Sequence, residues 1–204
     1  MKVAEGPQYQ NPPPGTHVAR CISLIDLGTQ PVEWQGAKKY QRKVRVTWEL
    51  PDTKMDDGRP FSASRRYTFT LDKRSALRKD LEAWRGGVKF TPEQLAGFEL
   101  KVILGTACQL TLVEQGDYVN VSSVAGIPKG MKVPPQVNVS VFFSLDPAEF
   151  DVKSFGLLSE KTRELITASP EYAALVGKQT DPADHPGDAD ADAARSDSED
   201  DVPF

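Results

Sequence analysis

A strict alternation of apolar and polar residues from Gln41 to Leu50 constrains the fold more than any other feature of this sequence. Successive side chains of an extended strand point to opposite faces. The two faces of this segment are Val44, Val46, Trp48 and Leu50, and Lys43, Arg45, Thr47 and Glu49. The pattern predicts a β-strand with an apolar face toward a core and a polar, largely basic face toward solvent.

The next segment continues the pattern after a turn. Residues 51–60 are rich in turn formers, including Asp57-Gly58, and they reverse the chain. From Phe61 to Leu71, inward apolar positions such as Phe69 alternate with polar residues. The two segments therefore predict a β-hairpin with a basic outer face. Spacing also assigns four aromatic residues to the core, namely Trp48, Phe69, Trp84 and Phe98.

Three more strands and two helices complete the expected body. Residues 16–27 form a strand that is apolar on both faces, and residues 107–114 and 118–125 form a second hairpin. Between them, Asp72 is the expected N-cap of a helix to Arg85 that plugs an open end of the sheet. Thr91 and Gln94 form a capping box for a shorter helix. The order β-β-β-α-β-β is that of a five-stranded OB-fold barrel, in a chain that is mainly β with a few helices.

The chain divides into three expected parts. Residues 1–126 form the OB-fold domain with a Pro-rich lead. Residues 127–177, with a strand at 136–145 and two helices, form an ordered appendage packed on the barrel or on a neighbouring subunit. The second of these helices is capped by Ser169, starts at Pro170 and stops at Gly177. Residues 178–204 are expected to be a disordered acidic tail.

Charge is strongly partitioned along the sequence. The whole chain has a formal net charge of −4. Residues 181–204 hold nine acidic residues against the single base Arg195, for a net charge of −8. Residues 38–89 hold fifteen basic and seven acidic residues, for a net charge of +8. The overall charge counts against nucleic-acid binding, but the basic central stretch supports it.

Composition argues against several classes of protein. The chain has 2 Cys and 2 His, and they are too few and too dispersed for a disulfide framework or a zinc site. No cofactor or metal site is expected, because turn chemistry accounts for Asp52, Asp56 and Asp57. Sequence motifs of catalysis are absent, so we expect no enzyme. The sequence lacks an apolar run of about 18 residues and a signal-like N-terminus, which indicates a cytoplasmic protein without membrane contact.

Aromatic residues interleave with cations in the connection from Thr29 to Arg45. Single-stranded nucleic acid needs rings for base stacking and cations for phosphates. An OB fold would place this connection, the outer face of its second and third strands and the turn near Tyr118 around one groove. The expected single-stranded DNA contacts are Trp34, Lys38, Lys39, Tyr40, Lys43, Arg45, Arg59, Arg65, Arg66, Tyr67 and Tyr118. Core packing is the alternative for Trp34 and the default for Tyr67, and incidental exposure is the alternative for Tyr118.

The acidic segment ends in Asp200, Asp201, Val202, Pro203 and Phe204. A hydrophobic pocket for Phe204, with a basic residue beside it, could capture this tip. The tip resembles the Asp-Asp-Ile-Pro-Phe ending of bacterial single-stranded DNA-binding proteins, which their replication and repair partners recognise. Residues 12–176 are similar to phage-encoded single-stranded DNA-binding proteins, through Ala19-Arg20-Cys21, residues 25–31, residues 48–51 and residues 81–86.

The resemblance implies a sequence-independent binder of single-stranded DNA in phage replication, recombination or repair. Such a protein would act in the host bacterial cytoplasm, as a monomer or homo-oligomer, and recruit host or phage replication and repair proteins through residues 200–204. The alternative is an adaptor of a replication complex, whose barrel binds protein and has little affinity for single strands. A preference for single-stranded over duplex DNA separates the two.

Overall fold

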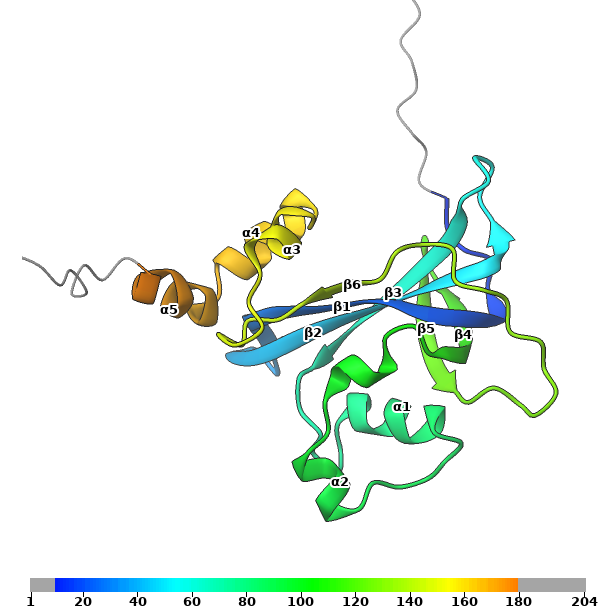
Figure 1. Cartoon of the computed structure of the whole chain (residues 1–204), viewed down its shortest axis with the longest axis horizontal. Helices are drawn as coiled ribbons and strands as arrows, with labels where there is room; N and C mark the ends of the chain where they lie inside the picture. Colours follow the sequence, from blue (N-terminus) through cyan, green and yellow to red (C-terminus); the bar gives the residue numbers. More distant parts are fainter. Residues whose placement is uncertain (1–9, 180–204) are drawn as a thin grey trace, which may run out of the picture.

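A computed structural model describes residues 10–179 of the chain (Figure 1). Its described part is mainly β with a few helices, as the sequence predicts. The strands are β1 (Gly15–Trp34), β2 (Ala37–Lys54), β3 (Pro60–Thr68), β4 (Ala107–Gln115), β5 (Tyr118–Ala125) and β6 (Val141–Phe143). The helices are α1 (Ala76–Trp84), α2 (Pro92–Ala96), the 3-10 helix η1 (Leu100–Ile103), α3 (Val152–Gly156), α4 (Glu160–Thr167) and α5 (Pro170–Gln179).

The strands form one sheet in the order β3-β2-β1-β4-β5. These neighbours pair antiparallel, and β6 adds to β1 in parallel. Within residues 10–179 no ladder joins β3 to β5, so the closed barrel expected from the sequence is not confirmed. Side chains bridge this gap instead: Arg65 of β3 donates to the Ser122 carbonyl of β5 at 3.4 Å and to Asp80 of α1 at 3.0 Å.

Two apolar clusters share β1, which is why its apolar residues occur on both faces. The larger cluster contains Leu24 and Trp48 and is covered by Leu77, Leu81 and Trp84 of α1. The sequence predicts a helix that plugs an open end of the sheet, and the observed helix packs on the sheet beside β3 and β5. It begins after Ser75, whose hydroxyl accepts from the Arg78 amide, and not after Asp72 as predicted. Asp72 instead accepts from the Arg74 amide in the preceding turn.

The second cluster joins residues 141–175 to the opposite face of β1. It is built around Ile25, Leu27, Phe143 and Ile166, all buried. Thus helices α3–α5 pack on the same chain, on the other side of the sheet from α1 and α2, and β6 joins the sheet beside β1 (Figure 1). The first of the two helices expected in residues 127–177, with Leu157 near its start, is divided into α3 and α4, and Leu157 itself is 80% exposed. The Ser169 cap, Pro170 start and Thr91–Gln94 capping box are as predicted, but α5 runs past Gly177 to Gln179.

A buried carboxylate explains why the strand predicted at 136–145 shrinks to three residues. Glu49 lies on the expected solvent face of β2, yet it is 0% exposed. It accepts from the Val137 amide at 2.7 Å and from the amide and side chain of Asn138 at 2.8 and 2.7 Å. Because the backbone amides of Val137 and Asn138 donate to Glu49, they do not pair with a neighbouring strand. Arg20, its partner on β1, holds the same segment through the Pro134 carbonyl at 2.7 Å.

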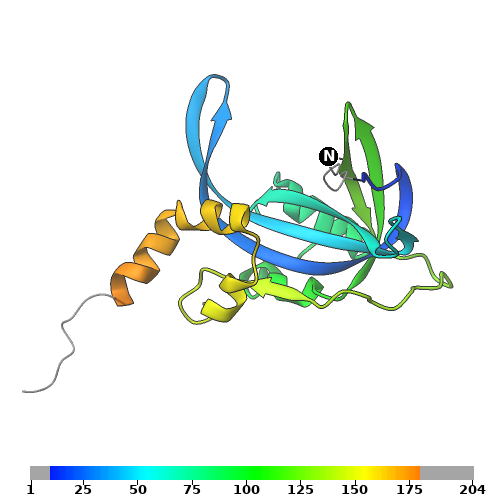
Figure 2. The ribbon, with the colours of Figure 1, turned by 90° about the horizontal axis from the view of Figure 1, so that it is seen from above.

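The connection from Thr29 to Arg45 is not the loop that the sequence predicts. Strands β1 and β2 continue pairing to Trp34 and Ala37 and form a long hairpin that projects from the body (Figure 2). Its two-residue turn has positive φ at Gln35 (52°) and Gly36 (75°). Such a turn matches the twist of the flanking strands, so the ladder runs to the tip. We call residues 29–42 the arm.

Candidate nucleic-acid interface

The arm presents two faces with different neighbours. By alternation along β2, Lys39, Lys43 and Arg45 lie on the outer face of the sheet, whereas Lys38 and Tyr40 lie on the other face. Lys38 Nζ stands 5.7 Å from the centre of the Tyr40 ring, and Tyr40 is 65% exposed. Trp34 pairs with Ala37 at the tip, and its side chain is outside the described part. Residues expected in one groove are thus divided between two faces.

The outer face of β2 and β3 gathers cations. Arg45 lies directly across from Arg66, and Lys43 lies across from Thr68. Burial lowers the pKa of Arg45, and the neighbouring Arg66 charge lowers it further. Arg66 is exposed, and no ion pair to it occurs within residues 10–179. Since like charges across a ladder repel, an anion bound here would stabilise the pair.

Arg45 and Lys43 already contact neighbouring side chains, which reduces the surface that a ligand could bind. Arg45 is half-buried under α4 and donates to the Thr162 hydroxyl at 3.1 Å. Lys43 Nζ donates to Gln41 at 2.7 Å and to Thr68 at 3.0 Å, and burial lowers its pKa. Helix α4 therefore borders the cationic path at Arg45. The exposed cations of this path are Lys39 and Arg66.

A polar pocket continues the outer face beyond Arg66. It has a volume of about 280 Å³, and Tyr118, 68% exposed, stands at its edge. Its lining comes from four separate segments: Asn11 and Pro12, Thr47, residues 62–64, and residues 118–120. Tyr118 thus lies beside β2 and β3, as the sequence predicts. The arrangement brings a ring and hydrogen-bonding side chains to the end of a cationic path.

Arg65 and Tyr67 do not belong to this surface. Tyr67 is 3% exposed and its hydroxyl donates to Asp80 at 2.7 Å. The Arg65 guanidinium lies 5.1 Å from the Tyr67 ring and binds the same carboxylate. Burial, followed by the Asp80 charge, raises the pKa of Tyr67. Both residues link β3 to α1 through Asp80. Tyr67 is therefore a core residue, which was its default interpretation, and it is not placed to contact DNA.

Arg59 also lies apart from the path. It is in the β2–β3 turn, at the end of β2 remote from the arm, and pairs with Asp57 at 2.6 Å. The hydrogen bond from Arg59 holds the pKa of Asp57 below its ordinary value. Both side chains are exposed, so the pair is weak. Within residues 10–179 no group of three or more His, Cys, Asp or Glu side chains could hold a metal ion.

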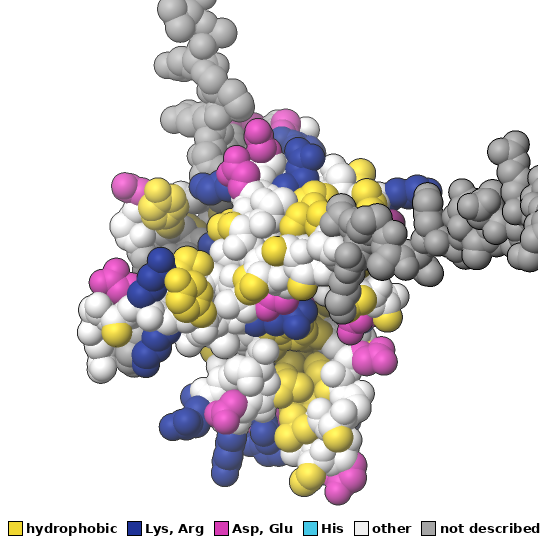
Figure 3. Space-filling model, turned by 90° about the vertical axis from the view of Figure 1, so that its left-hand side faces the viewer, with side chains coloured by type: hydrophobic (Ala, Val, Ile, Leu, Met, Phe, Trp, Pro, Cys, Tyr) yellow, Lys and Arg dark blue, Asp and Glu magenta, His cyan; other side chains and the backbone are white. Residues whose placement is uncertain are grey.

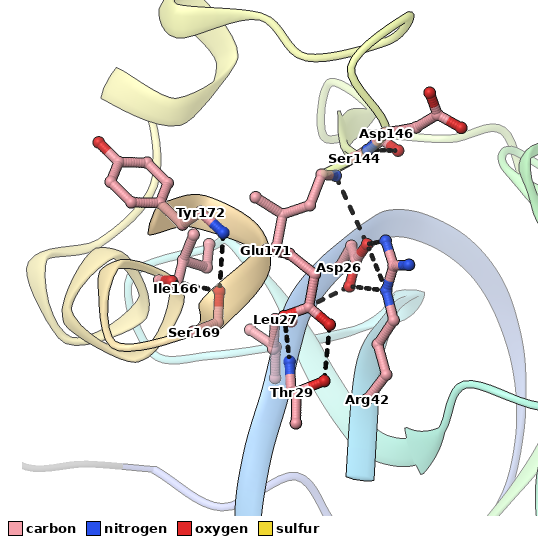
Figure 4. A network of polar contacts seen from close by, with 12 residues as sticks. Asp26, Leu27, Thr29, Arg42, Ser144, Asp146, Ile166, Ser169, Glu171 and Tyr172 are labelled. Carbon is pink, nitrogen blue, oxygen red and sulfur yellow. Dashed lines mark hydrogen bonds and ion pairs between the residues drawn. The ribbon is translucent and has the colours of Figure 1, made fainter. Parts of the chain in front are cut away.

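The root of the arm is fixed by polar contacts that sequence reasoning missed (Figure 4). Asp26, 4% exposed, pairs with Arg42 and accepts from the Gly28 amide at 3.0 Å. Glu171 of α5 accepts from the Thr29 amide at 2.8 Å and its hydroxyl at 2.6 Å. Although burial opposes it, these bonds hold the pKa of Glu171 below its ordinary value. The sequence held one sign of this contact, because Gly28 directly follows the apolar strand pattern of residues 16–27.

One residue assigned to the core lies at the surface near this root. Phe69 is 40% exposed, and the Arg42 guanidinium stands 5.5 Å from the centre of its ring. Both line a pocket of about 260 Å³ between the sheet, η1 and residues 142–149. In Figure 3, which views this end of the molecule, apolar side chains gather on the surface with both basic and acidic side chains around them. Four carboxylates, Asp26, Glu99, Asp146 and Glu149, also line this pocket, which disfavours phosphate.

The remaining sequence expectations concern the cysteines, the membrane and the tip. Cys21 and Cys108 are free, buried and near each other, and burial raises the pKa of Cys21 to about 12. None of the described helices is long and apolar enough to cross a membrane. Residues 200–204, and the tail expected to be disordered, lie outside the described residues apart from the end of α5. No protein-family model, curated protein or solved structure matches the chain.

Proposed function

We propose that the chain binds single-stranded DNA without sequence preference along the outer face of β2 and β3. The strand would run from Lys39 on the arm past Lys43 and Arg66 to the polar pocket beside Tyr118. Phosphates would lie on the cations while a base stacks on the exposed Tyr118 ring. The order β3-β2-β1-β4-β5, with α1 between β3 and β4, supports an OB-fold reading in which β3 and β5 would close the barrel.

The observation that carries the proposal is the continuity between the Arg45–Arg66 pair and the Tyr118 pocket. Two cations face each other on the outer face of the ladder, and the next cross-strand pair on that face, Thr47 and Ser64, lines the pocket. Repulsion between Arg45 and Arg66 costs stability in the free protein. A phosphate bound between the two guanidinium groups would offset their repulsion, whereas contact with an uncharged protein surface would not.

The test is fluorescence anisotropy with labelled mixed-sequence oligonucleotides, single-stranded and duplex, over a range of salt concentrations. We expect single strands to bind more tightly, with affinity falling steeply as salt rises. Arg66→Gln should weaken binding and reduce the salt slope by about one phosphate contact. The matched control is Arg74→Gln, because Arg74 is a 94% exposed cation before α1 and outside the path. Equal effects of the two substitutions would reject the path.

The resemblance to phage and bacterial single-stranded DNA-binding proteins supports the wider setting of this proposal. The protein would protect single strands during phage replication, recombination or repair in the host cytoplasm, and residues 200–204 would recruit partner proteins. If single strands and duplexes bind equally weakly, the DNA proposal fails and the adaptor alternative gains support.

A further inference from the structure

The arm carries two of the expected DNA contacts that the outer-face path does not use. Lys38 and Tyr40 lie on the face of β2 opposite to Lys39, and we call this the inner face of the arm. Tyr40 is 65% exposed, and no carboxylate pairs with Lys38 within residues 10–179. A two-stranded hairpin by itself is at best marginally stable in water. The inner face of the arm would therefore gain stability from a partner.

The pocket at the root of the arm has the complementary character. Its volume of about 260 Å³ is below the roughly 300–1,000 Å³ of small-molecule sites, so it suits one or two protruding side chains. Its apolar wall includes Phe69 and Phe142, and its lining holds four carboxylates and two cations, for a net charge of −2. One of the carboxylates, Asp26, is already paired with Arg42. We call this the root pocket.

The other three carboxylates of the root pocket are exposed and are not held by cations. Among the described residues, Glu99, Asp146 and Glu149 make no ion pair. Lys101, the second cation of the lining, stands instead 4.4 Å from the centre of the Phe142 ring. The rim of the pocket is therefore open to a cation that arrives from outside.

The arm of the same chain does not reach this pocket. Arg42 lines the root pocket, and Lys38 lies four residues nearer the tip of the arm. At about 3.3 Å per residue, the strand carries Lys38 roughly 13 Å away from the root. The ladder has no register shift between Gly28 and Trp34, so the arm does not fold back on its root (Figure 2). An arm that fills a root pocket therefore belongs to a second copy.

We propose that the arm of one copy docks in the root pocket of a second copy, with the Tyr40 ring on its apolar wall and the Lys38 ammonium on its free carboxylates. Charge favours this occupant, because residues 29–42 hold three cations and one carboxylate, whereas the pocket carries −2. The one carboxylate of the arm, Glu33, lies across from Lys38 in the ladder. In the docked arrangement it would face Lys101 of the pocket.

The proposed contact joins two different surfaces, so it is heterologous. Each copy has one arm and one root pocket, and copies would therefore join head to tail into rings or open chains. A single arm buries little area, so the contact between free copies is weak. Copies bound side by side on one DNA strand would be held at a high local concentration, which would strengthen it. That consequence rests on the proposed function, whereas docking itself requires no nucleic acid.

The experiment is sedimentation velocity of the full chain without nucleic acid, at low salt and over a wide range of protein concentrations. We expect the weight-average sedimentation coefficient to rise with concentration. Lys38→Glu and Glu149→Lys should each abolish the rise, and both change exposed side chains, so the fold should be kept. The matched controls are Lys39→Glu, on the opposite face of the same strand, and Glu114→Lys, at an exposed site outside the pocket. Both controls should keep the rise.

An equal mixture of the two defective variants tests whether the arm and the pocket meet each other. The unmodified arm of Glu149→Lys fits the unmodified pocket of Lys38→Glu, and the two exchanged charges also attract. The mixture should therefore regain the rise that each variant lacks alone.

Three results would overturn the proposal. A sedimentation coefficient that does not change with concentration would show that copies do not join. Loss of the rise in Lys38→Glu but not in Glu149→Lys would assign the contact to arm against arm. Loss in both variants without recovery in the mixture would show that the two sites do not meet. None of these results bears on the affinity for single strands, so this proposal and the proposed function can fail separately.

Discussion

Gly28 of β1 and Ser169, the N-cap of α5, approach so closely that a Cβ on Gly28 would lie 2.4 Å from the Ser169 Cβ. Gly28 sits at a bulge in the β1–β2 ladder and has φ +69°. The contact sets helix α5 on the root of the arm, beside the Thr29–Glu171 hydrogen bonds. Two segments that are remote in sequence thereby fix the direction in which the arm leaves the body.

Gly28→Ala should destabilise the protein by more than backbone strain alone. Positive φ costs a non-glycine residue about 1–2 kcal/mol, and the clash with Ser169 adds to it. Gly116→Ala is the matched control, because Gly116 has φ +60° and nothing within 4 Å of its Cβ position. Urea unfolding measures both. Equal losses would mean that the Gly28–Ser169 contact is not tight in solution.

Glu49→Ala should release the segment around Val137 from the sheet. The substitution removes an acceptor of three hydrogen bonds and leaves donors without partners, at a cost of about 1–3 kcal/mol. Limited proteolysis should then cleave residues 126–140 faster than in the unmodified chain. Glu114→Ala, at an exposed site in β4, serves as the control. Unchanged cleavage would contradict the anchoring role of Glu49.

The Glu82 carboxyl should make stability depend on pH. Hydrogen bonds from Lys89 and then Arg78 lower its pKa from 4.5 to about 2. Its contribution to the free energy of unfolding is therefore fully present above pH 4.5 and is lost as the pH falls toward 2. Urea unfolding should show Glu82→Gln less stable at pH 7, with a difference that shrinks between pH 5 and 2.5. A constant difference would assign the loss to packing.

Substitutions at Tyr118 and Tyr67 should affect different properties, the first DNA binding and the second protein stability. Tyr118→Leu should weaken single-stranded DNA binding by roughly 5- to 150-fold, the equivalent of about 1–3 kcal/mol for a stacked base, with little change in unfolding. Tyr67→Phe should cost about 1 kcal/mol of stability through the lost Asp80 bond and leave affinity unchanged. Anisotropy and urea unfolding of both variants check this, and the reverse assignment would refute the interface.

Truncation after Thr180 should tighten single-stranded DNA binding, most at low salt. The removed residues carry −8 and compete with phosphates for the cations of the body. Anisotropy at two salt concentrations tests this, with a chain whose nine acidic residues after Thr180 are replaced by Asn and Gln as a length-matched control. Unchanged affinity in both would rule out the competition.

The strands and their order followed from local patterns. Alternation placed Val44, Val46 and Trp48 in the core, and the capping box at Thr91 set the start of α2. These predictions hold because period-two burial and helix caps depend on neighbours within a few residues. The cationic character of the outer face of β2 and β3 was also evident from alternation alone.

Tertiary contacts decided what local pattern could not. Alternation assigns Glu49 to solvent and Phe69 to the core, but the segment at 137–138 buries the first, and the second is left partly exposed beside Arg42. Arg65 and Tyr67 became links to Asp80, because α1 lies in the gap between β3 and β5. Burial and pairing with residues remote in sequence are properties of the packed chain. The sequence by itself thus determined where the strands of the main sheet lie along the chain, and packing determined how far the strands extend and which of their side chains remain free to bind.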